Sequence, residues 1–241
     1  MNCSQGNKIL GFPKKLFYNP RLDWHKINSN LFPIQGRILD VGCGDGLFIG
    51  LAPKRITGLD LDRHSLKGCI RKGYRVINGD ALQLPFKDQS FQCVHCADLI
   101  EHFLPHDARR LLMEMLRVLE VGGFLTVATP LPSKMFWDNP FHVRPYPPYA
   151  LLSYCIQNTR EYAGQETEHH ILPYNMKFIK LIRRHGPFYQ LPLHIYFRED
   201  RIKLPNLMKF SSLLFILSNL LYRIGIKHPR PEGYVLLLQK V

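Results

Sequence analysis

The feature of this sequence that most constrains its fold is the alternation of short apolar runs with helical segments over residues 35–130. We predict strands at 37–41, 55–61, 74–79, 91–97 and 122–130. Helices are predicted between them, at 45–52, 64–72 and 107–120. Such an alternation is typical of an α/β fold, in which helices cover both faces of a parallel sheet. Ligands of these sheets bind beyond the carboxyl ends of the strands, near the point where the strand order reverses.

The segments that flank this core are less regular. Residues 1–34 contain three prolines that interrupt regular structure, and they are predicted to lead into the first strand. After Pro130 we predict helices at 148–157 and 174–185, strands at 189–197 and 233–241, and a basic, apolar insert at 199–232. A chain of 241 residues fits a single domain, with a lead-in (1–34), a ligand-binding core (35–130) and a C-terminal part that completes the site (131–241).

The net charge of +13 is distributed unevenly. Residues 131–241 carry 15 Lys plus Arg against 7 Asp plus Glu, whereas residues 1–130 carry 17 against 12. An acidic acceptor, a nucleic acid or an anionic membrane surface would each suit this excess, and so would solubility alone.

The six cysteines are predicted to be free thiols in a reducing compartment. Cys93 and Cys96 have a CxxC spacing, but residues three apart in a strand point to opposite faces. A second CxxC that would complete a zinc site is absent from the sequence. The first ten residues, MNCSQGNKIL, lack the apolar region of a signal peptide. We therefore expect a cytoplasmic protein, with peripheral attachment to the inner face of a membrane as an alternative.

The turn after the first predicted strand, in ILDVGCGDG (38–46), indicates the kind of ligand. A dinucleotide fingerprint reads G-x-G-x-x-G, whereas here the third glycine comes one position too early. This departure argues against a nicotinamide-dependent oxidoreductase. Carboxylates follow four successive strands and should converge at one edge of the sheet: Asp40, Asp60, Asp80 and Asp98. A ring of acids would repel a phosphate and suits a ligand with cationic centres and a ribose diol, such as S-adenosylmethionine.

Five motifs in the same region carry a resemblance to a known family: ILDVGCGDG, GLDLD, NGDALQLPFKDQSFQCV, LIEH and RVLEVGGFLTVATP. Over about residues 36–130 the chain resembles the class I S-adenosylmethionine-dependent methyltransferases, in particular the type 11 group. The resemblance implies a Rossmann-like sheet of seven strands, mostly parallel with the last strand antiparallel. It also implies that the chain is a methyltransferase with S-adenosyl-L-methionine as its cofactor.

The same resemblance assigns cofactor-binding residues: Asp40, Gly42, Gly44, Asp60, Leu61, Asp80, Ala81 and Ala97. It implies that the two glycines let the methionine part of the cofactor lie against the turn, and that Asp40 orients its ammonium group. Asp60 would bind both ribose hydroxyls, and Leu61 would lie against the adenine. Asp80 would bind the adenine amino group beside Ala81, and backbone near Ala97 would close over the methionine part.

Three further aspartates are predicted to be structural. Asp45 is expected to cap the first helix and Asp62 the second, because aspartate accepts hydrogen bonds from free amides at helix N-termini. Asp88, in FKDQSF, fits a turn.

Two histidines are candidate catalytic residues. An oxygen acceptor has to lose a proton, and histidine is the commonest general base. His102 follows the fourth strand, and His142 lies in DNPFHVRPY after the fifth. That short segment also resembles one in bacterial methyltransferases associated with surface-glycan and lipid-linked sugar assembly. Arg144 could bind an acidic acceptor group, or His142 and Arg144 could simply hold their loop in place.

Asp98, Glu101 and His102 are candidate metal ligands, because they have the i, i+3, i+4 spacing of one helical face. Family members that methylate RNA ends or quinone precursors hold a divalent metal with a similar group. Here the first residue is the shorter Asp, and many relatives with this Glu-His pair have no metal, so we predict none. A second cluster, ETEHH (166–170), is expected to be a solvated loop.

The insert at 199–232 has a composition that bears on whether the protein binds a membrane, another subunit or a nucleic acid. Its uncharged stretch, 210–222, has 13 residues, whereas a bilayer span needs about 20. Basic residues flank this stretch, as in helices that lie in a membrane interface, although a helix packed on the sheet or on another subunit has the same pattern. Because the basic residues alternate with apolar runs, we do not expect a nucleic-acid partner.

The predicted acceptor is a small molecule, a glycan or a lipid-linked compound, methylated on oxygen. The alternatives are a methyltransferase of RNA or protein, and a non-catalytic S-adenosylmethionine-binding protein. The sequence indicates no oligomeric state.

Overall fold

The computed structural model describes residues 20–33, 35–156, 172–185, 217, 220–221 and 231–241. The chain divides into two compact units, residues 21–184 with 231–241, and residues 1–20 with 185–230. Nearly all of the described residues belong to the first of these units. The single domain with internal boundaries at 34 and 130 stays a prediction.

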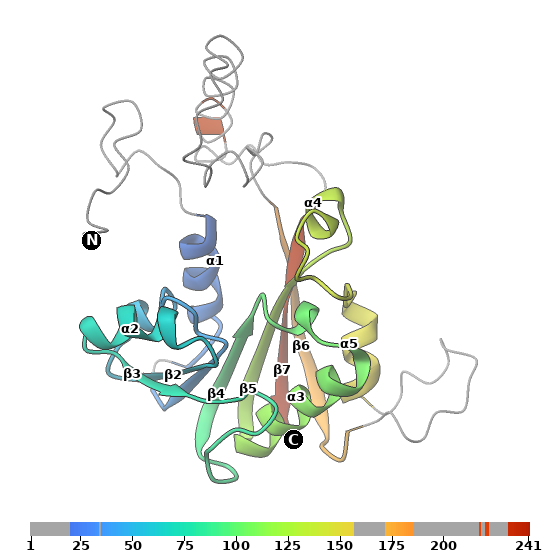
Figure 1. The fold of residues 1–241 in the computed structure, drawn as a ribbon. Coiled ribbons are helices and arrows are strands. Elements are labelled where there is room, and N and C mark those ends of the chain that lie inside the picture. Colours follow the sequence, from blue (N-terminus) through green and yellow to red (C-terminus); the bar gives the residue numbers. More distant parts are fainter. Residues whose placement is uncertain (1–19, 34, 157–171, 186–216, 218–219, 222–230) are drawn as a thin grey trace, which may run out of the picture. The chain divides into compact units, whose positions relative to one another are not determined.

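The described part of the chain is built around a seven-stranded sheet with the order β3-β2-β1-β4-β5-β7-β6 (Figure 1). The strands are β1 (Ile38–Val41), β2 (Ile56–Asp60), β3 (Arg75–Asn78), β4 (Phe91–Ala97), β5 (Leu119–Pro130), β6 (Met176–Arg184) and β7 (Gly233–Lys240). β1 to β5 pair in parallel, whereas β7 is antiparallel to both β5 and β6. The predicted seven-stranded sheet with an antiparallel last strand is confirmed.

The helical elements connect and cover these strands. They are α1 (Pro20–Ser29), η2 (Ile49–Leu51), α2 (Arg63–Arg71), η3 (Ile100–His102), α3 (Pro105–Val118), α4 (Lys134–Trp137) and α5 (Pro148–Cys155), of which η2 and η3 are 3₁₀ turns. α3 shows why such segments become helices: Pro105 stands in its first turn, and its buried residues recur every three or four positions along one face.

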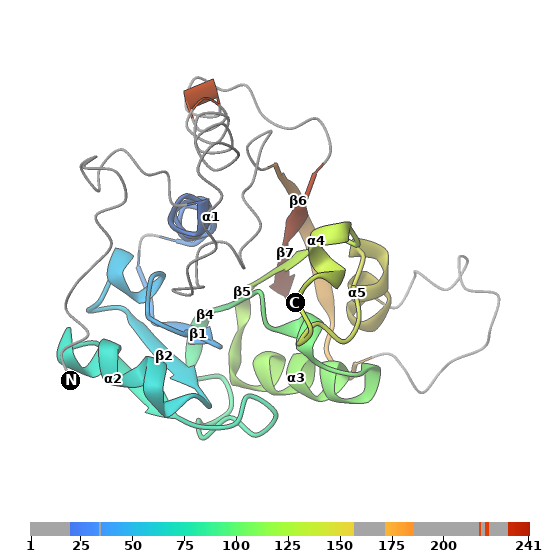
Figure 2. The same cartoon turned by 45° about the horizontal axis from the view of Figure 1, so that its top comes forward.

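The sheet separates two apolar clusters, because side chains alternate between its faces. On one face Leu39, Val94 and Leu236 pack with α3 and α5. On the other face Ile38 and Cys93 pack with η2 and α2. Figure 2 shows α1 and α3 on opposite sides of β4 and β5. The four residues of β1 are all buried, as expected for a strand that is covered on both faces.

Cys93 and Cys96 belong to different clusters, so their side chains point to opposite faces as predicted. Every cysteine in the described ranges is a free, buried thiol. The CxxC spacing therefore forms neither a disulfide nor a metal site within these ranges.

The strand order reverses between β1 and β4. The chain passes from β1 outward to β2 and β3, and then returns to the other side of β1 as β4. Ile38 pairs with Ile56 of β2 and with Cys93 of β4, so the three strands run level toward their carboxyl ends. This edge is where a ligand is expected in an open α/β sheet.

Two helix predictions are wrong. Residues 174–185, predicted as a helix, contain the strand β6, which pairs with β7 at the edge of the sheet. Its sequence MKFIKLIRR suits both periodicities, and pairing with a long buried neighbour favours the strand. The helix predicted at 45–52 is reduced to η2 because a glycine-rich turn precedes it.

Two other predictions lie largely outside the described residues, namely the strand at 189–197 and the insert at 199–232. Within the described part of the chain, no helix combines the length and the apolar character that crossing a bilayer requires.

Candidate functional site

The glycine turn after β1 lies at the carboxyl edge of the sheet. Gly42 N and Cys43 N both donate to Leu59 O of β2, at 2.8 and 3.0 Å, which holds the turn beside the neighbouring strand. Gly42 and Gly44 have φ values of +74° and +50°, a region that favours glycine. A Cβ atom added to Gly44 would meet nothing within 4 Å, so the backbone there faces open space. The turn can therefore take a ligand against its main chain.

Asp60, the last residue of β2, has a carboxylate held by two backbone amides. Oδ2 accepts from Gly44 N and Oδ1 from Asp62 N, both at 2.8 Å. Each carboxylate oxygen has two lone pairs, so both can accept a further hydrogen bond. The carboxylate is thus oriented beside the open turn and can bind a pair of neighbouring hydroxyls, as predicted for a ribose.

Asp40 lies in β1, just before the glycine turn. Its side chain is only 3% exposed, and burial, followed by the charge of Asp60, raises its pKa well above the usual value. A cationic group beside Asp40 would favour its ionised form, whereas a phosphate would be repelled. The electrostatics of this edge therefore suit a ligand that brings positive charge.

The other predicted cofactor residues lie near the same edge. Leu61 follows β2 and is 72% exposed, so it offers an apolar surface to a planar ring. Asp80 accepts a hydrogen bond from Leu82 N at 2.9 Å, and Ala81 beside it is buried. Ala97 is the last residue of β4. The open space at Gly44 and the oriented carboxylate of Asp60 fit an S-adenosylmethionine cofactor, for which these eight residues would be the binding set.

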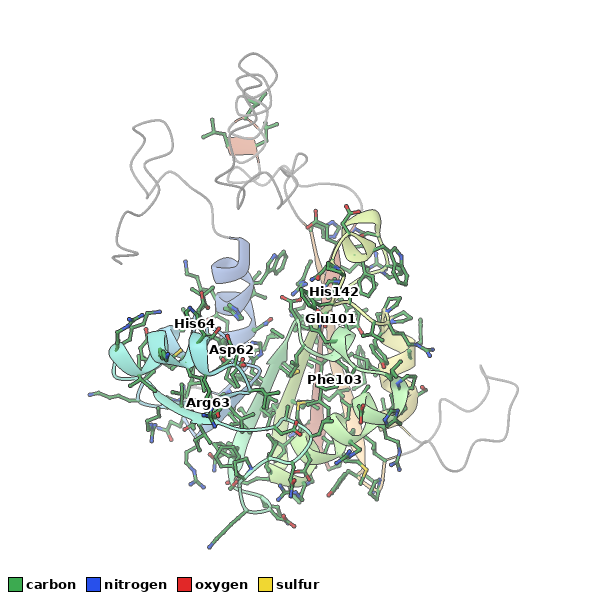
Figure 3. All side chains as sticks on the ribbon, viewed as in Figure 1. Asp62, Arg63, His64, Glu101, Phe103 and His142 are labelled. Atoms are coloured by element: carbon green, nitrogen blue, oxygen red, sulfur yellow. The ribbon has the colours of Figure 1, made fainter. Side chains whose placement is uncertain are left out.

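The three aspartates predicted to be structural have different outcomes. Asp62 caps α2, since its side chain accepts from His64 N and Ser65 N, and Figure 3 shows it at the start of that helix. Asp88 lies in a turn as predicted, and it also pairs with Arg117. Asp45 does not cap η2, whose N-cap position is Phe48 and has no side-chain cap hydrogen bond.

A loop that follows β5 is fixed onto η3 by hydrogen bonds. Val143 N and Arg144 N donate to Glu101 O at 2.9 and 3.2 Å. His102 Nδ1 lies 2.8 Å from Phe141 O. The hydroxyl of Tyr146 donates to Phe103 O at 2.9 Å. These contacts bring together segments about forty residues apart in the sequence.

The two predicted catalytic histidines therefore lie side by side, with ring centroids 5.1 Å apart. His142 Nδ1 is 2.9 Å from Phe136 O, and its ring packs on Phe136. A carbonyl oxygen can only accept, so Nδ1 carries a proton in both histidines, and in a neutral imidazole of this tautomer the lone pair is on Nε2. Burial lowers the pKa of His142, with a contribution from His102, so its imidazole is neutral near pH 7.

Glu101 is a functional candidate that the sequence indicated only weakly. Its side chain is fully buried, and Thr129 Oγ1 donates to its Oε2 at 3.0 Å. Burial, with the charge of Asp98, raises its pKa to about 8. Figure 3 shows Glu101 and His142 at the same end of the sheet, and one ligand atom from each of Glu101, His102 and His142 lies within 4.8 Å of the others.

Asp98 does not join Glu101 and His102, although their spacing suggested a shared helical face. Asp98 precedes η3, adopts a left-handed φ of +51°, and forms an ion pair with Arg184 at 2.7 Å. The group of donor atoms in the structure therefore shares Glu101 and His102 with the sequence pattern, but has His142 in place of Asp98. The second cluster, at 166–170, lies outside the described residues.

The histidine pair and the glycine turn are connected by Leu99. A Cβ atom added to Gly42 would lie only 2.9 Å from Cδ2 of Leu99, so Leu99 packs against the turn. Glu101 follows Leu99 by two residues. Burial raises the pKa of Cys96, and the charges of Glu101, Asp40 and Asp98 add to that shift. Both groups of candidate residues thus lie toward the carboxyl ends of β1 and β4.

The chain is similar to several known methyltransferases. Residues 39–127 match the family model described as a methyltransferase domain. The chain is similar to phthiotriol/phenolphthiotriol dimycocerosates methyltransferase 1 of Mycobacterium ulcerans, with 41% identity over 119 residues, 46% of this chain and 43% of the relative. It is also similar to tRNA (carboxymethyluridine(34)-5-O)-methyltransferase of Arabidopsis thaliana, with 31% identity over 108 residues, 43% of this chain and 27% of the relative.

The matches therefore span less than half the length of either curated relative. Among solved structures, a SAM dependent methyltransferase from Archaeoglobus fulgidus has a similar fold, with a TM-score of 0.56 and 19% identity over 97% of this chain and all of that chain.

Proposed function

We propose, from the premise that residues 39–127 belong to the methyltransferase-domain family, that this chain transfers a methyl group to an oxygen atom of a small-molecule, glycan or lipid-linked acceptor. S-adenosylmethionine supplies the reactive methyl group on its sulfonium centre. The observation that carries oxygen as the acceptor atom is the free Nε2 of neutral His142, at the same edge of the sheet as Asp60 and Gly44.

The glycine turn and the acids position the cofactor. Asp60 would accept hydrogen bonds from two ribose hydroxyls, and Gly44 would let the methionine part lie on its main chain. Asp40 would face the ammonium group, directly or through water. Holding two reactants in a reactive orientation can supply about 7–11 kcal/mol of the barrier, so this binding geometry is a large part of the proposed catalysis.

His142 and His102 serve the acceptor. A neutral imidazole with a free Nε2 can take the proton of a hydroxyl as that oxygen attacks. The hydrogen bond from Nδ1 of His142 to Phe136 O fixes the ring and favours this tautomer. Arg144, whose guanidinium lies 5.9 Å from the centre of the Tyr146 ring, could bind an acidic group of the acceptor.

Apolar side chains beside the histidines favour an acceptor with apolar parts. Three of them near His142 in the sequence are exposed: Trp137 61%, Phe141 75% and Val143 45%. A lipid-linked compound would cover such a surface, and a Mycobacterium ulcerans relative is named for phthiotriol dimycocerosates. The alternative acceptor is RNA, because the name of the Arabidopsis thaliana relative specifies a tRNA uridine oxygen.

Calorimetry and an unbiased methylation screen test the proposal. S-adenosylmethionine and its demethylated product should each bind the purified chain at one site. Labelled methyl donor would then be incubated with lipid, glycan, RNA and protein fractions of an extract. We expect label in the lipid or glycan fraction, bound through oxygen. Absence of cofactor binding by folded protein would refute the proposal, and label in RNA would select the alternative acceptor.

His142→Ala tests the catalytic assignment on the acceptor so found. Turnover should fall about a hundredfold or more, the usual contribution of a general base, with little change in cofactor affinity. His106→Ala is the matched control, since His106 is an exposed histidine on α3. Normal turnover in His142→Ala would contradict this role for His142.

A further inference from the structure

The loop of residues 79–90, which joins β3 to β4, begins with two of the predicted cofactor-binding residues. Asp80 and Ala81 follow Gly79, just after the end of β3. A Cβ atom added to Gly79 would lie 3.7 Å from Cδ of Pro85, so the loop folds back onto its own start. The place of Asp80 at the sheet edge therefore depends on what holds the rest of this loop.

Arg117, in the last turn of α3, holds the loop with every N–H donor of its guanidinium group. Nε and Nη2 donate to Oε1 and Oε2 of Glu114, both at 2.8 Å. Nη1 donates to Phe86 O at 2.8 Å and to Asp88 Oδ1 at 2.7 Å. Nη2 donates also to Leu84 O at 2.9 Å. Arginine has five such donors, so all of them are used here.

Glu114 adds a further contact from the same helix. Its Oε2 also accepts a hydrogen bond from Leu84 N at 2.8 Å, so Leu84 is held through both its amide and its carbonyl. The side chains of Arg117 and Glu114 are only 25% and 20% exposed. Hydrogen bonds from Arg117 lower the pKa of Glu114, so its carboxylate is ionised at neutral pH. The loop is thus held mainly by its main chain, through charge-assisted hydrogen bonds that are stronger than neutral ones.

An ordinary surface ion pair on α3 shows how different this arrangement is. Arg110 Nη1 lies 3.9 Å from Asp107 Oδ1, and the Arg110 side chain is 59% exposed. Such a pair contributes little to stability. Arg117 instead binds three groups of the loop besides Glu114. A lysine, with three donors on one nitrogen, could not make all of these contacts.

We propose that Glu114 and Arg117 are positioning residues for the adenine end of the cofactor site. By fixing the loop of residues 79–90 they would set the place of Asp80, which on the proposed function accepts a hydrogen bond from the adenine amino group. The inference rests on that function. Two strands separate β3 from β4 in the sheet, so this end of the site lies apart from η3 and its histidine. The pair should therefore govern recognition of the base and leave the methyl-transfer step unchanged.

Calorimetry with two ligands that differ only at the base tests this role. One is S-adenosylhomocysteine, the demethylated product, and the other is its analogue with hydrogen in place of the adenine amino group. A hydrogen bond to a carboxylate corresponds to a preference of about 10- to 100-fold, which the wild type should show for S-adenosylhomocysteine. Arg117→Lys should reduce this preference at least threefold, and Glu114→Gln should reduce it in the same direction. Arg110→Lys, the matched control on the same helix, should keep it.

Two further measurements separate positioning from general stability. Asp80→Ala alone should abolish the preference, and adding Arg117→Lys to it should cause no further loss, because both changes act on one contact. Hydrogen exchange of residues 79–90 should become faster in Arg117→Lys, whereas exchange of β1 should stay as in the wild type. On an acceptor found by the screen, Arg117→Lys should raise the KM for S-adenosylmethionine and retain kcat.

Equal loss of affinity for both ligands in Arg117→Lys is the result of a purely structural role and would overturn the inference. Unchanged exchange of residues 79–90, or a wild type without preference between the ligands, would overturn it too. If Arg117→Lys does not fold, Glu114→Gln gives the same two readouts. Failure of the folded wild type to bind either ligand would refute the proposed function together with the inference, so the two failures are distinguished by the wild type alone.

Discussion

Two carboxyl groups at the sheet edge, those of Asp60 and Asp40, lie in different environments. Asp60 is held by the amides of Gly44 and Asp62, which orient its carboxylate. Asp40 is buried, and its pKa is raised. The first suits hydroxyl groups and the second a cation, so we propose that the two aspartates bind different parts of one ligand.

Replacing Asp60 should weaken cofactor binding without unfolding the chain. Asp60→Ala removes hydrogen bonds to a charged acceptor, each contributing about 1.5–3 kcal/mol, so affinity for S-adenosylmethionine should fall at least tenfold. Calorimetry measures the change, and circular dichroism verifies the fold. Asp45→Ala is the control, because Asp45 is an exposed acid in the same turn. Equal loss of affinity in both variants would contradict a specific role for Asp60.

The buried carboxyl of Asp40 should make stability depend on pH. Because its folded pKa is raised, ionisation is less favourable in the folded than in the unfolded state. The wild type should therefore lose stability relative to Asp40→Asn as pH rises from the unfolded pKa, near 4, toward the folded pKa. Above that range Asp40→Asn should be the more stable protein, because the folded wild type then carries a buried negative charge.

Urea unfolding at several pH values checks this difference. The same variant should bind S-adenosylmethionine more weakly than the wild type near neutral pH, because the amide lacks the negative charge that faces the ammonium. If Asp40→Asn has the stability of the wild type at every pH, burial does not disfavour the ionised carboxylate of Asp40. If its affinity for S-adenosylmethionine is also unchanged, Asp40 does not contact the cofactor.

At the scale of elements, hydrogen bonds to η3 hold the loop between β5 and α5 in position. Its backbone amides at Val143 and Arg144 converge on Glu101 O, and Tyr146 reaches Phe103 O. The hydroxyl of Tyr234, on β7, in turn donates to Tyr146 O. The loop is thus held between the 3₁₀ turn and the sheet, and this holds His142 beside His102.

Loosening one of these tethers should affect turnover more than binding of the cofactor. Tyr146→Phe removes the hydrogen bond to Phe103 O and should lower the unfolding free energy by about 1 kcal/mol. Turnover should fall severalfold, because His142 is placed less well, while affinity for S-adenosylmethionine stays the same. Tyr149→Phe is the matched control on a 78% exposed tyrosine. If both variants have wild-type turnover, the tether does not set the position of His142.

At the scale of the whole molecule, the sheet brings the candidate residues at its strand ends together. The strands that carry Asp40, Asp60 and Ala97 end together beside the reversal between β1 and β4. The chain has a net charge of +13, and most of the excess of basic residues is in residues 131–241. The acids at the strand ends come earlier in the sequence. The basic insert at 199–232 is the segment most suited by composition to an anionic surface.

The composition of the insert predicts salt-dependent binding to anionic vesicles. A basic residue near an anionic lipid surface contributes roughly 1 kcal/mol, and salt screens that contribution. The wild type should sediment with anionic vesicles more than with neutral ones, and less as salt rises. The charge-reversed variant Lys209→Glu, Arg223→Glu, Lys227→Glu should lose this binding. Equal sedimentation of both proteins would leave the insert as an intramolecular or subunit contact.

The sequence by itself determined the core of the sheet and located the candidate cofactor residues at its edge. ILDVGCGDG and the acids at successive strand ends can be interpreted without coordinates, because parallel strands bring their carboxyl ends to one edge. The glycines at 42 and 44 permit the positive φ angles of this turn, although the residue type alone does not fix them.

Only the tertiary structure decided how the acceptor side is assembled. Backbone hydrogen bonds join His142 to η3, and such bonds leave no pattern in the side chains. The left-handed turn at Asp98 sends its carboxylate to Arg184, so the i, i+3, i+4 spacing was misleading. β6 is a strand because it pairs with β7, whereas its local sequence also suits a helix. Short-range spacing predicts what neighbouring residues do, but contacts between distant segments depend on the packing of the whole sheet.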